Sequence, residues 1–364
     1  MKKIEFSLFQ KFRNKNVIVT GHTGFKGSWL AFWLKSLGAK VVGISNNISN
    51  PSNFNALGLK KEIKNNLIDI RNLNKLKKII SVTKPDYIFH LAAQSLVKKS
   101  YMRPINTFNT NSIGTLNVLE SIRNIKKKCT VIIITSDKSY RNLELKRGYK
   151  ENDILGGIDP YSASKASAEI IIQSYFHSYL KKNKNLRIGV ARAGNVIGGG
   201  DWSEDRLVPD CIKSWSKNKK VILRNPDSTR PWQHVLEAVG AYLLFAKKLS
   251  KDSKLNGEVF NFGSKYQKNF TVLTMIKKMK NYWHKVNWKI KRKNKNEIYY
   301  ESKLLRLNCI KAKKRLKWNS ILNINETIGM TINWYKKFYS EPKKIRDLAL
   351  SQIKTYEKLI LKRL

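Results

Sequence analysis

Residues 16–38 read NVIVTGHTGFKGSWLAFWLKSLG. The apolar, β-branched run at 16–20 predicts a strand, and the residues after the glycine turn have the periodicity of a helix. Gly21, Gly24 and Gly27 stand between the two in the pattern G-x-x-G-x-x-G. Glycines let a backbone turn sharply and approach a pyrophosphate, whose charge meets the free amides and positive end of the helix. The stretch therefore predicts a dinucleotide-binding turn, although glycines also punctuate ordinary turns.

Apolar strands and helical segments alternate along the following residues. After the first strand we expect strands at 40–45, 87–93, 130–135 and 187–193, with helices between them. Continuously apolar strands that alternate with helices are typical of a parallel sheet covered on both faces. The sequence therefore predicts an α/β, Rossmann-like, doubly wound fold.

The later part of the chain adds a smaller α/β lobe. The segment FNFG at 260–263 reads as a returning strand, which implies that the chain rejoins the nucleotide-binding domain there. The expected division is a nucleotide-binding domain at 10–194 and 235–263, a substrate-binding lobe at 195–234 and 264–340, and a helical tail at 341–364. Within the last two parts we expect a helix in the segment 265–280 and a solvated amphipathic helix over 340–364.

The strongly basic composition predicts attraction of anionic ligands. The formal net charge is +47, but the lysines are scattered along the chain and form no single block. A biased background composition explains this pattern better than a specific nucleic-acid partner does. Binding of anions should weaken with salt.

Neither a membrane nor a disulfide framework is expected. No apolar run approaches the roughly 18 residues that span a bilayer, and MKKIEFSLFQKF is too short in apolar length for a signal peptide. Cys129, Cys211 and Cys309 are odd in number and lack a C-x-x-C pattern, which argues against disulfides and a metal site. We expect a cytoplasmic protein with reduced cysteines.

The turn after the second expected strand bears on the choice between NAD and NADP. The acidic residue that usually bonds the adenosine ribose is missing, and Ser45, Asn46 and Asn47 stand there instead. No arginine in that turn is available to bind a 2′-phosphate, which favours NAD.

Two further strand ends offer contacts to the same ligand. Asp69 and Ile70 follow the expected third strand, where they can bond an adenine amine and pack on its ring, or equally form a strand-end cap before the helix from Leu73. Leu91, Ala92 and Ala93 lie at the tip of the fourth strand, where open α/β sheets bind ligands, and the two alanines give a cofactor close access.

Residues 135–165 carry the candidate chemistry. Tyr161 and Lys165 are four residues apart, so they share one face of a helix, where the ammonium favours the phenolate. A phenolate at neutral pH is a usable base, although many pairs with this spacing only decorate solvated helices. Asp137 and Lys138 precede them, directly after an expected strand.

Several segments together, in this order and spacing, resemble one family: GHTGFKGSWL, HLAAQS, TSDKSY, DPYSASKASAE, ARAGNVIGGGDW, RLVPD and RPWQHVLEA. They resemble the extended short-chain dehydrogenase/reductases and, within them, the CDP-glucose 4,6-dehydratases. The resemblance runs from about residue 10 to residue 335. The lysine of Gly-Phe-Lys-Gly, the Asp-Lys pair and Arg-Pro-Trp-Gln-His-Val are more specific than the general motifs.

The resemblance implies a redox-neutral dehydration of CDP-glucose with NAD as cofactor. Hydride leaves carbon 4 while Tyr161, which shares the hydroxyl with Ser136, takes its proton; water is lost across carbons 5 and 6, and the hydride returns to carbon 6. Asp137 would be the acid for the departing hydroxyl. Lys138 would be either an uncharged base at carbon 5 or a cation that stabilises the enolate. Lys165 would also bond the nicotinamide ribose.

The resemblance also extends the binding sites. Thr23, Phe25 and Lys26 of the glycine turn join the cofactor site. The expected substrate-binding residues are Gln94, Ser95, Asn195, Arg224, Arg230, His234 and Arg306. Arg224 and Arg230 offer planar bidentate donors suited to a diphosphate. Competing interpretations are loop punctuation at Asn195, a structural histidine at His234 and a surface position for Arg306.

Helices around 106–124 and 161–180 are expected to pair across a homodimer, although their apolar residues would also fit a monomer's core. The enzyme alternatives are an NDP-sugar 4-epimerase and a dehydratase of another nucleotide sugar. Asp137 and Lys138 favour dehydration, since epimerisation needs no acid for a leaving hydroxyl. An alternative of a different class is a non-catalytic basic protein that binds nucleotides or nucleic acid, against which the intact Ser136, Tyr161 and Lys165 argue.

Overall fold

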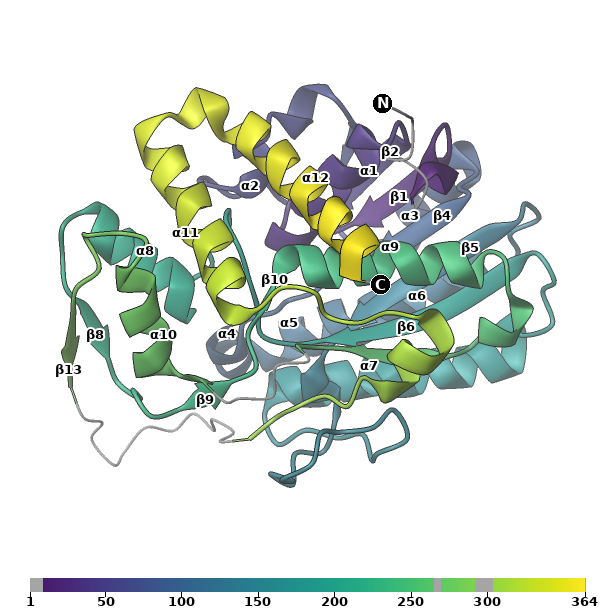
Figure 1. Ribbon diagram of the computed structural model, residues 1–364. Coiled ribbons are helices and arrows are strands. Elements are labelled where there is room, and N and C mark those ends of the chain that lie inside the picture. The colour runs from purple at the N-terminus through teal and green to yellow at the C-terminus, as the bar shows by residue number, and fades with distance from the viewer. Residues whose placement is uncertain (1–8, 265–269, 292–303, 364) are drawn as a thin grey trace.

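The computed structural model describes residues 9–264, 270–291 and 304–363. Its centre is a seven-stranded sheet whose neighbouring strands are all parallel, in the order β11-β6-β5-β4-β1-β2-β3 (Figure 1). The strands are β1 (Asn16–Thr20), β2 (Lys40–Ser45), β3 (Lys64–Leu67), β4 (Tyr87–His90), β5 (Cys129–Thr135), β6 (Leu186–Ala193) and β11 (Val259–Phe262). The strand order reverses at β1, as in doubly wound nucleotide-binding folds, so the predicted fold class is confirmed.

Helices cover both faces of this sheet. One face packs against α1 (Phe25–Ser36) and α9 (Val235–Leu249), and the other against α3 (Leu73–Thr83), α6 (Gly114–Ile122) and α7 (Pro160–Tyr175). Side chains along a strand alternate between the two cores: Val17 and Val19 face the first, and Ile18 faces the second. Burial on both faces explains why β1 and β5 read as uninterrupted apolar runs.

Strand β4 ends earlier than the predicted strand at 87–93. The amides of Leu91 and Ala92 both donate to Oγ1 of Thr20, at 3.2 and 3.1 Å. The same hydroxyl bonds Nδ1 of His90 at 2.7 Å. Because the Thr20 side chain meets these amides, the chain after His90 turns out of the sheet.

The helices predicted at 106–124 and 161–180 are found, and both contain a π turn. The first comprises α5 (Pro104–Phe108), a π turn at Asn109–Ile113 and α6; the second is α7 followed by a π turn at Phe176–Leu180. The first π turn places Asn111 between α7 and the end of β4. Its Nδ2 donates to Oγ of Ser164 and to the carbonyl of Gln94, both at 2.9 Å.

A smaller lobe lies beside the carboxyl ends of the strands (Figure 1, left). It contains α8 (Leu207–Ser216) and α10 (Val272–Lys280). Its paired strands are β7 (Val196–Ile197) with β10 (Gln233–His234), β8 (Val221–Leu223) with β13 (Trp288–Ile290), and β9 (Thr229–Arg230) with β12 (Phe270–Thr271). The remaining α-helices are α2 (Asn53–Ala56), α4 (Val97–Met102), α11 (Ile324–Ser340) and α12 (Ile345–Arg363).

The helix predicted within 265–280 begins only at Val272. Phe270 and Thr271 pair with β9 instead, and Oγ1 of Thr271 caps α10 by accepting from the amide of Thr274 at 3.1 Å. The rest of that prediction, at 265–269, lies outside the described residues.

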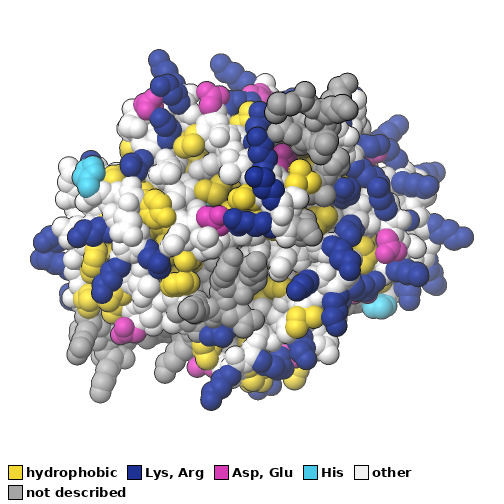
Figure 2. Space-filling model, in the orientation of Figure 1, with side chains coloured by type: hydrophobic (Ala, Val, Ile, Leu, Met, Phe, Trp, Pro, Cys, Tyr) yellow, Lys and Arg dark blue, Asp and Glu magenta, His cyan; other side chains and the backbone are white. Residues whose placement is uncertain are grey.

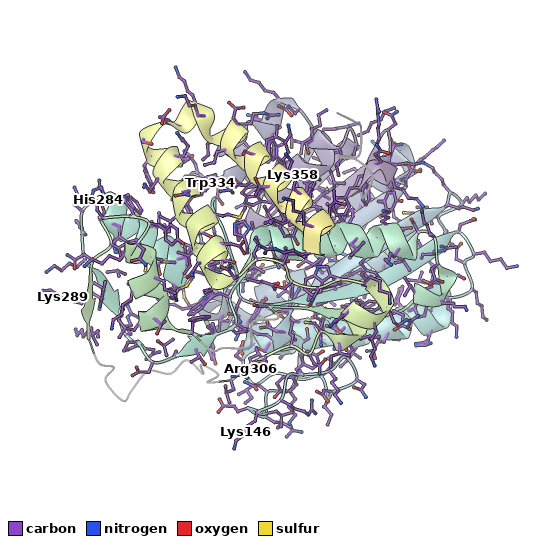
Figure 3. The ribbon with its side chains drawn as sticks, viewed as in Figure 1. Lys146, His284, Lys289, Arg306, Trp334 and Lys358 are labelled. Carbon is purple, nitrogen blue, oxygen red and sulfur yellow. The ribbon has the colours of Figure 1, made fainter. Side chains whose placement is uncertain are left out.

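The C-terminal helix α12 packs against the nucleotide-binding core. Figure 3 shows Lys358 on this helix and Trp334 on α11 beside it. The indole of Trp33 on α1 donates to Glu357 at 2.7 Å and meets the ring of Tyr356 edge-on, with centroids 5.9 Å apart. The predicted helix is found, but the face that carries Tyr356 is buried rather than solvated, because it packs against α1 and α11.

Tyr356 also anchors α12 to a buried carboxylate. Its hydroxyl donates to Oε2 of Glu237 at 2.8 Å, while the amides of Ile321 and Leu322 donate to Oε1. Tyr356→Phe removes one donor from this group, and we expect a loss of about 1–3 kcal/mol in the free energy of unfolding, measured in urea. Tyr339→Phe, at a side chain 43% exposed, is the control. Equal stability of both variants would contradict this role.

Basic side chains are spread over the surface rather than gathered in one block. Figure 2 shows lysine and arginine over most of the visible face, with few acidic groups. Among the residues that the structure describes, no helix combines the length and apolar character needed to cross a membrane.

Candidate active site

A cavity of about 900 Å³ opens at the carboxyl ends of the central strands. It joins the glycine turn after β1, the residues after β4 and β5, and the inner side of the smaller lobe. This is where open α/β sheets bind their ligands, because the strand order reverses there. A cavity of this size accommodates a cofactor and a substrate together.

Most residues predicted for the three sites line this one cavity. Those from the cofactor prediction are Gly21, Thr23, Gly24, Phe25, Lys26, Gly27, Asp69, Ile70, Leu91, Ala92 and Ala93. Those from the catalytic prediction are Ser136, Asp137, Lys138, Tyr161 and Lys165. Those from the substrate prediction are Ser95, Asn195, Arg224 and Arg230. Three residues of the substrate prediction do not line the cavity: Gln94, His234 and Arg306.

The glycine turn is packed too closely for side chains. Gly21 has a φ of +71°, and a Cβ there would lie 2.8 Å from the amide nitrogen of Ala92. A Cβ on Gly27 would lie 2.0 Å from the carbonyl oxygen of Gly21. Gly24 is the N-cap of α1 and has no capping side chain, so the first-turn amides face the cavity without a side-chain partner. This geometry fits a dinucleotide pyrophosphate.

The rim of the turn is fixed by Thr23. Its hydroxyl donates to the carbonyl of Asn47 at 2.7 Å and bonds Oγ of Ser45 at 2.6 Å. The turn after β2 is therefore tied to the glycine turn, so Ser45 and Asn47 stand beside the predicted cofactor site in place of an acidic residue.

Asp69 already has a partner within the chain. Its carboxylate accepts from the backbone amide, Nε and Nη2 of Arg71 at 2.8, 3.0 and 2.7 Å. Hydrogen bonds from Arg71 lower the pKa of Asp69. Asp69 therefore closes the turn after β3, while helix α3 itself is capped by Asn72, whose side chain accepts from the amide of Lys75.

Asp137, the carboxylic acid of the catalytic group, is buried. Only 4% of it is exposed, and its Oδ1 accepts from Oγ of Ser136 at 2.8 Å. Its Oδ2 accepts from Nδ2 of Asn195 at 3.4 Å. A Cβ on Gly194 would lie 1.9 Å from this carboxylate, so the glycine makes room for it. Asn195 thus meets the acid, a contact that its prediction as a diphosphate ligand did not include.

Tyr161 and Lys165 are both buried on α7 and border the same cavity. Burial raises the pKa of Tyr161 to about 12, and its hydrogen bond with Ser136 and the charge of Arg206 oppose this rise. Burial lowers the pKa of Lys165 to about 8, while Glu169 acts in the opposite direction. The Nζ of Lys165 donates to the carbonyl of Ile134 at 3.4 Å. The phenol, the acid and the ammonium therefore meet at one end of the cavity.

Lys26 adds a further cation from the start of α1. Burial, together with the charges of Lys165 and Arg206, lowers its pKa to about 8, while the charge of Asp137 acts in the opposite direction. The side chain predicted from Gly-Phe-Lys-Gly as a cofactor contact therefore also interacts electrostatically with the catalytic group.

Three predicted substrate residues have other surroundings. His234 is fully buried and caps α9, where its Nδ1 accepts from the amide of Leu236 at 3.3 Å; burial lowers its pKa to about 3. The Gln94 side chain closes its own turn through the amide and carbonyl of Leu96. The Arg306 carbonyl accepts from the amide of Tyr149 at 2.8 Å, and the residue lies in the lower half of Figure 3.

Arg206 is a residue that the sequence predictions did not select. It stands before α8 and donates to Asp201 at 3.0 Å and to Oγ of Ser95 at 3.0 Å. The guanidinium thus bridges the smaller lobe and the loop after β4, within the same cavity as Tyr161. The signal was present in the segment RLVPD, but an arginine before a helix does not reveal which partner it reaches.

Known proteins are similar to this chain over most of its length, including the segments that line the cavity. The family model described as GDP-mannose 4,6 dehydratase matches residues 18–331. A CDP-glucose 4,6-dehydratase of Salmonella typhimurium is 41% identical over 330 residues, which are 89% of this chain and 91% of that protein.

Solved structures show the same fold. The UDP-glucose 4-epimerase of Thermotoga maritima, solved with UDP-glucose, has a TM-score of 0.75 and 26% identity over 88% of this chain and 98% of that one. The UDP-glucuronic acid 4-epimerase of Bacillus cereus, in complex with UDP-glucuronic acid and NAD, has a TM-score of 0.75 and 22% identity over 89% of this chain and 99% of that one.

Proposed function

The chain belongs to the GDP-mannose 4,6-dehydratase family of extended short-chain dehydrogenase/reductases, and on this premise we propose that it dehydrates CDP-glucose to CDP-4-keto-6-deoxyglucose with NAD. The observation that carries the proposal is the Asp137–Lys138 pair in one cavity with Tyr161 and a glycine turn. The 41% identity to a CDP-glucose 4,6-dehydratase supports the choice of substrate.

The glycine turn and the strand ends are the proposed cofactor site. NAD supplies a hydride acceptor that gives the hydride back before the product leaves, so the overall reaction is redox-neutral. Gly21, Gly24 and Gly27 admit its pyrophosphate, and Ala92 and Ala93 leave room for the nicotinamide end. Lys165 lies at that end as a donor for the ribose.

Tyr161 is the proposed base for the hydroxyl at carbon 4. Tyr161 is hydrogen-bonded to Ser136, so the two side chains can share the carbon 4 hydroxyl while the phenolate accepts its proton. The charge of Arg206 favours the phenolate, which opposes the effect of burial. Loss of this proton, together with loss of the carbon 4 hydride to the cofactor, would turn carbon 4 into a ketone, which acidifies the hydrogen on carbon 5.

Asp137 is the proposed acid for the hydroxyl that leaves carbon 6. Burial and the donors Ser136 and Asn195 hold its carboxyl group in one orientation toward the cavity. Lys138 is half-buried at the wall of the same cavity. Its proposed role is either the base that removes the carbon 5 proton or a cation that stabilises the enolate. Arg224, Arg230 and Ser95 are the proposed contacts of the diphosphate and sugar.

A panel of nucleotide sugars tests the substrate. We expect turnover of CDP-glucose to a 4-keto-6-deoxy product without added reductant, and much weaker turnover of UDP-, dTDP- and GDP-linked sugars. Turnover of another nucleotide sugar in preference would keep the mechanism and change the substrate. Formation of a 4-epimer alone would favour the epimerase alternative, which the likeness to the Thermotoga maritima enzyme suggests.

Lys138→Met is expected to abolish elimination, with a loss in kcat of about 10²-fold or more, while NAD binding stays intact. Lys146→Met, in an exposed loop, is the matched control. Lys138→Arg separates the two roles, because arginine keeps the charge but does not act as an uncharged base. Retained turnover in Lys138→Met would remove Lys138 from the mechanism.

We also propose a cytoplasmic homodimer that pairs through α5, α6 and α7, with a product used for deoxysugars of surface polysaccharides such as O-antigen. Ile105 of α5, Ile113 of the π turn between α5 and α6, and Ile170 of α7 are 76%, 44% and 57% exposed. A second copy of this chain would cover them by forming a four-helix arrangement.

Ile105→Glu combined with Ile170→Glu is expected to convert the protein to a monomer at micromolar concentration, since burial of two carboxylates opposes the contact. Sedimentation velocity measures the change. Val82→Glu, an equally exposed apolar position on α3, is the control. A wild-type protein that sediments only as a monomer would reject the dimer.

A further inference from the structure

Helix α7 carries three polar side chains at intervals of four residues: Tyr161, Lys165 and Glu169. This spacing places them on one face of the helix. All three are buried, with 8%, 7% and 1% of each residue exposed. The first two line the catalytic cavity, but Glu169 does not. A buried charge outside the cavity has a cost that its partners must offset.

Glu169 is bonded to both neighbouring strands of the sheet. It forms an ion pair with Arg192 of β6, whose Nε lies 2.8 and 2.9 Å from its two carboxylate oxygens. Its Oε1 also accepts from Oγ1 of Thr135 at 2.7 Å. Arg192 in turn lies over the ring of Tyr140 at 4.5 Å and donates to the carbonyl of Glu151 at 3.1 Å. This network is rigid because each polar group has a partner.

The network connects the two segments that carry the catalytic residues, the turn after β5 and helix α7. Thr135 is the last residue of β5 and directly precedes Ser136, Asp137 and Lys138. Lys165 is one helical turn before Glu169 on α7. The carboxylate of Glu169 therefore connects the turn that carries the acid with the helix that carries the base.

Lys165 otherwise has unfavourable surroundings for a charge. Its charge lowers the pKa of Lys26 on α1 and of His90 on β4, and the carboxyl group of Asp137 lies in the same cavity. From β5 it meets only the carbonyl of Ile134 among the contacts of the described residues. Glu169 is the group that raises its pKa against burial.

We infer that Glu169 is a positioning residue of the proposed reaction: through Arg192 and Thr135 it is fixed one turn from Lys165, where its charge keeps the Lys165 ammonium protonated. The inference rests on the proposed function only for its kinetic consequence. The ammonium is needed to favour the Tyr161 phenolate, so activity should fall as pH rises through the pKa of Lys165.

The test uses Glu169→Gln, which keeps the shape and removes the charge. We expect the alkaline limb of the kcat profile to move down by on the order of one pH unit, which lowers kcat about tenfold above pH 8. The Lys165 ε-carbon signal in ¹³C-lysine-labelled protein, identified by its absence from Lys165→Arg, should titrate at correspondingly lower pH. Glu237→Gln, which alters an equally buried glutamate on α9, is the matched control. It should shift neither the alkaline limb of the kcat profile nor the titration of Lys165.

A second variant separates this role from folding. Glu169→Gln leaves Arg192 buried without its ionic partner, whereas Glu169→Gln combined with Arg192→Met removes both charges. The double variant should regain stability yet keep the downward shift of Lys165. An unchanged Lys165 titration in both variants would overturn the inference. Because the titration of Lys165 needs no substrate, it tests the inference even if the protein turns over no nucleotide sugar.

Discussion

Tyr161→Phe should lower kcat for formation of the 4-keto-6-deoxy sugar by about 10³-fold or more, because it blocks the first step of the reaction. Removal of the phenol oxygen leaves the carbon 4 hydroxyl without a base, so no ketone forms and no later step can begin. The affinity for CDP-glucose should change little, because the ring keeps its buried position on α7.

Tyr175→Phe provides a control on the same helix. The Tyr175 hydroxyl donates to Glu120 at 3.2 Å, away from the cavity, so its removal should leave kcat nearly unchanged. Steady-state kinetics and calorimetric titration with CDP-glucose separate a chemical effect from a binding effect. Near-normal turnover by Tyr161→Phe would show that another group takes the proton.

Asp137→Asn is the second large effect, with a loss in kcat of about 10²- to 10⁴-fold. The amide fits the same space beside Gly194 but has no proton to give to the departing hydroxyl. Oxidation at carbon 4 and loss of the carbon 5 proton do not need this acid. In deuterium oxide, we therefore expect recovered substrate to gain deuterium at carbon 5 although elimination has stopped.

This exchange separates the catalytic roles. Tyr161→Phe should show no exchange, since no ketone forms, and Lys138→Met should show none if Lys138 is the base. Asp153→Asn, at a carboxylate paired with Arg147 on the surface, is the control and should eliminate normally. Elimination at the normal rate by Asp137→Asn would assign the acid to another residue.

The parts of the fold that local sequence decides were predictable. Gly21 and Gly27 leave no room for a Cβ, and the apolar runs of β1 and β5 are buried on both faces, so pattern and structure agree. The end of β4 was not predictable, because it depends on a hydroxyl of Thr20 that is distant in sequence. The buried face of α12 likewise depends on a partner, Trp33, at the other end of the chain.

The candidate site divides in the same way. The spacing of Tyr161 and Lys165 implies their role, the family resemblance implies that of Asp137, and all three line the cavity. His234 stands in a motif of the same family, yet it caps a helix, because a motif does not tell a ligand from a structural group. Arg206 and Glu169 act across the fold, so their partners Ser95 and Arg192 are known only from the three-dimensional arrangement.

The most direct test of the proposed reaction follows one hydrogen atom. CDP-glucose that carries deuterium at carbon 4 is incubated with the purified protein without added reductant, and the product is examined by NMR and mass spectrometry. A 4-keto-6-deoxy product with the deuterium at carbon 6 is the predicted result, because the hydride removed in the first step returns in the last. Loss of the deuterium to solvent, or the absence of such a product from every nucleotide sugar tried, would contradict the proposed dehydration.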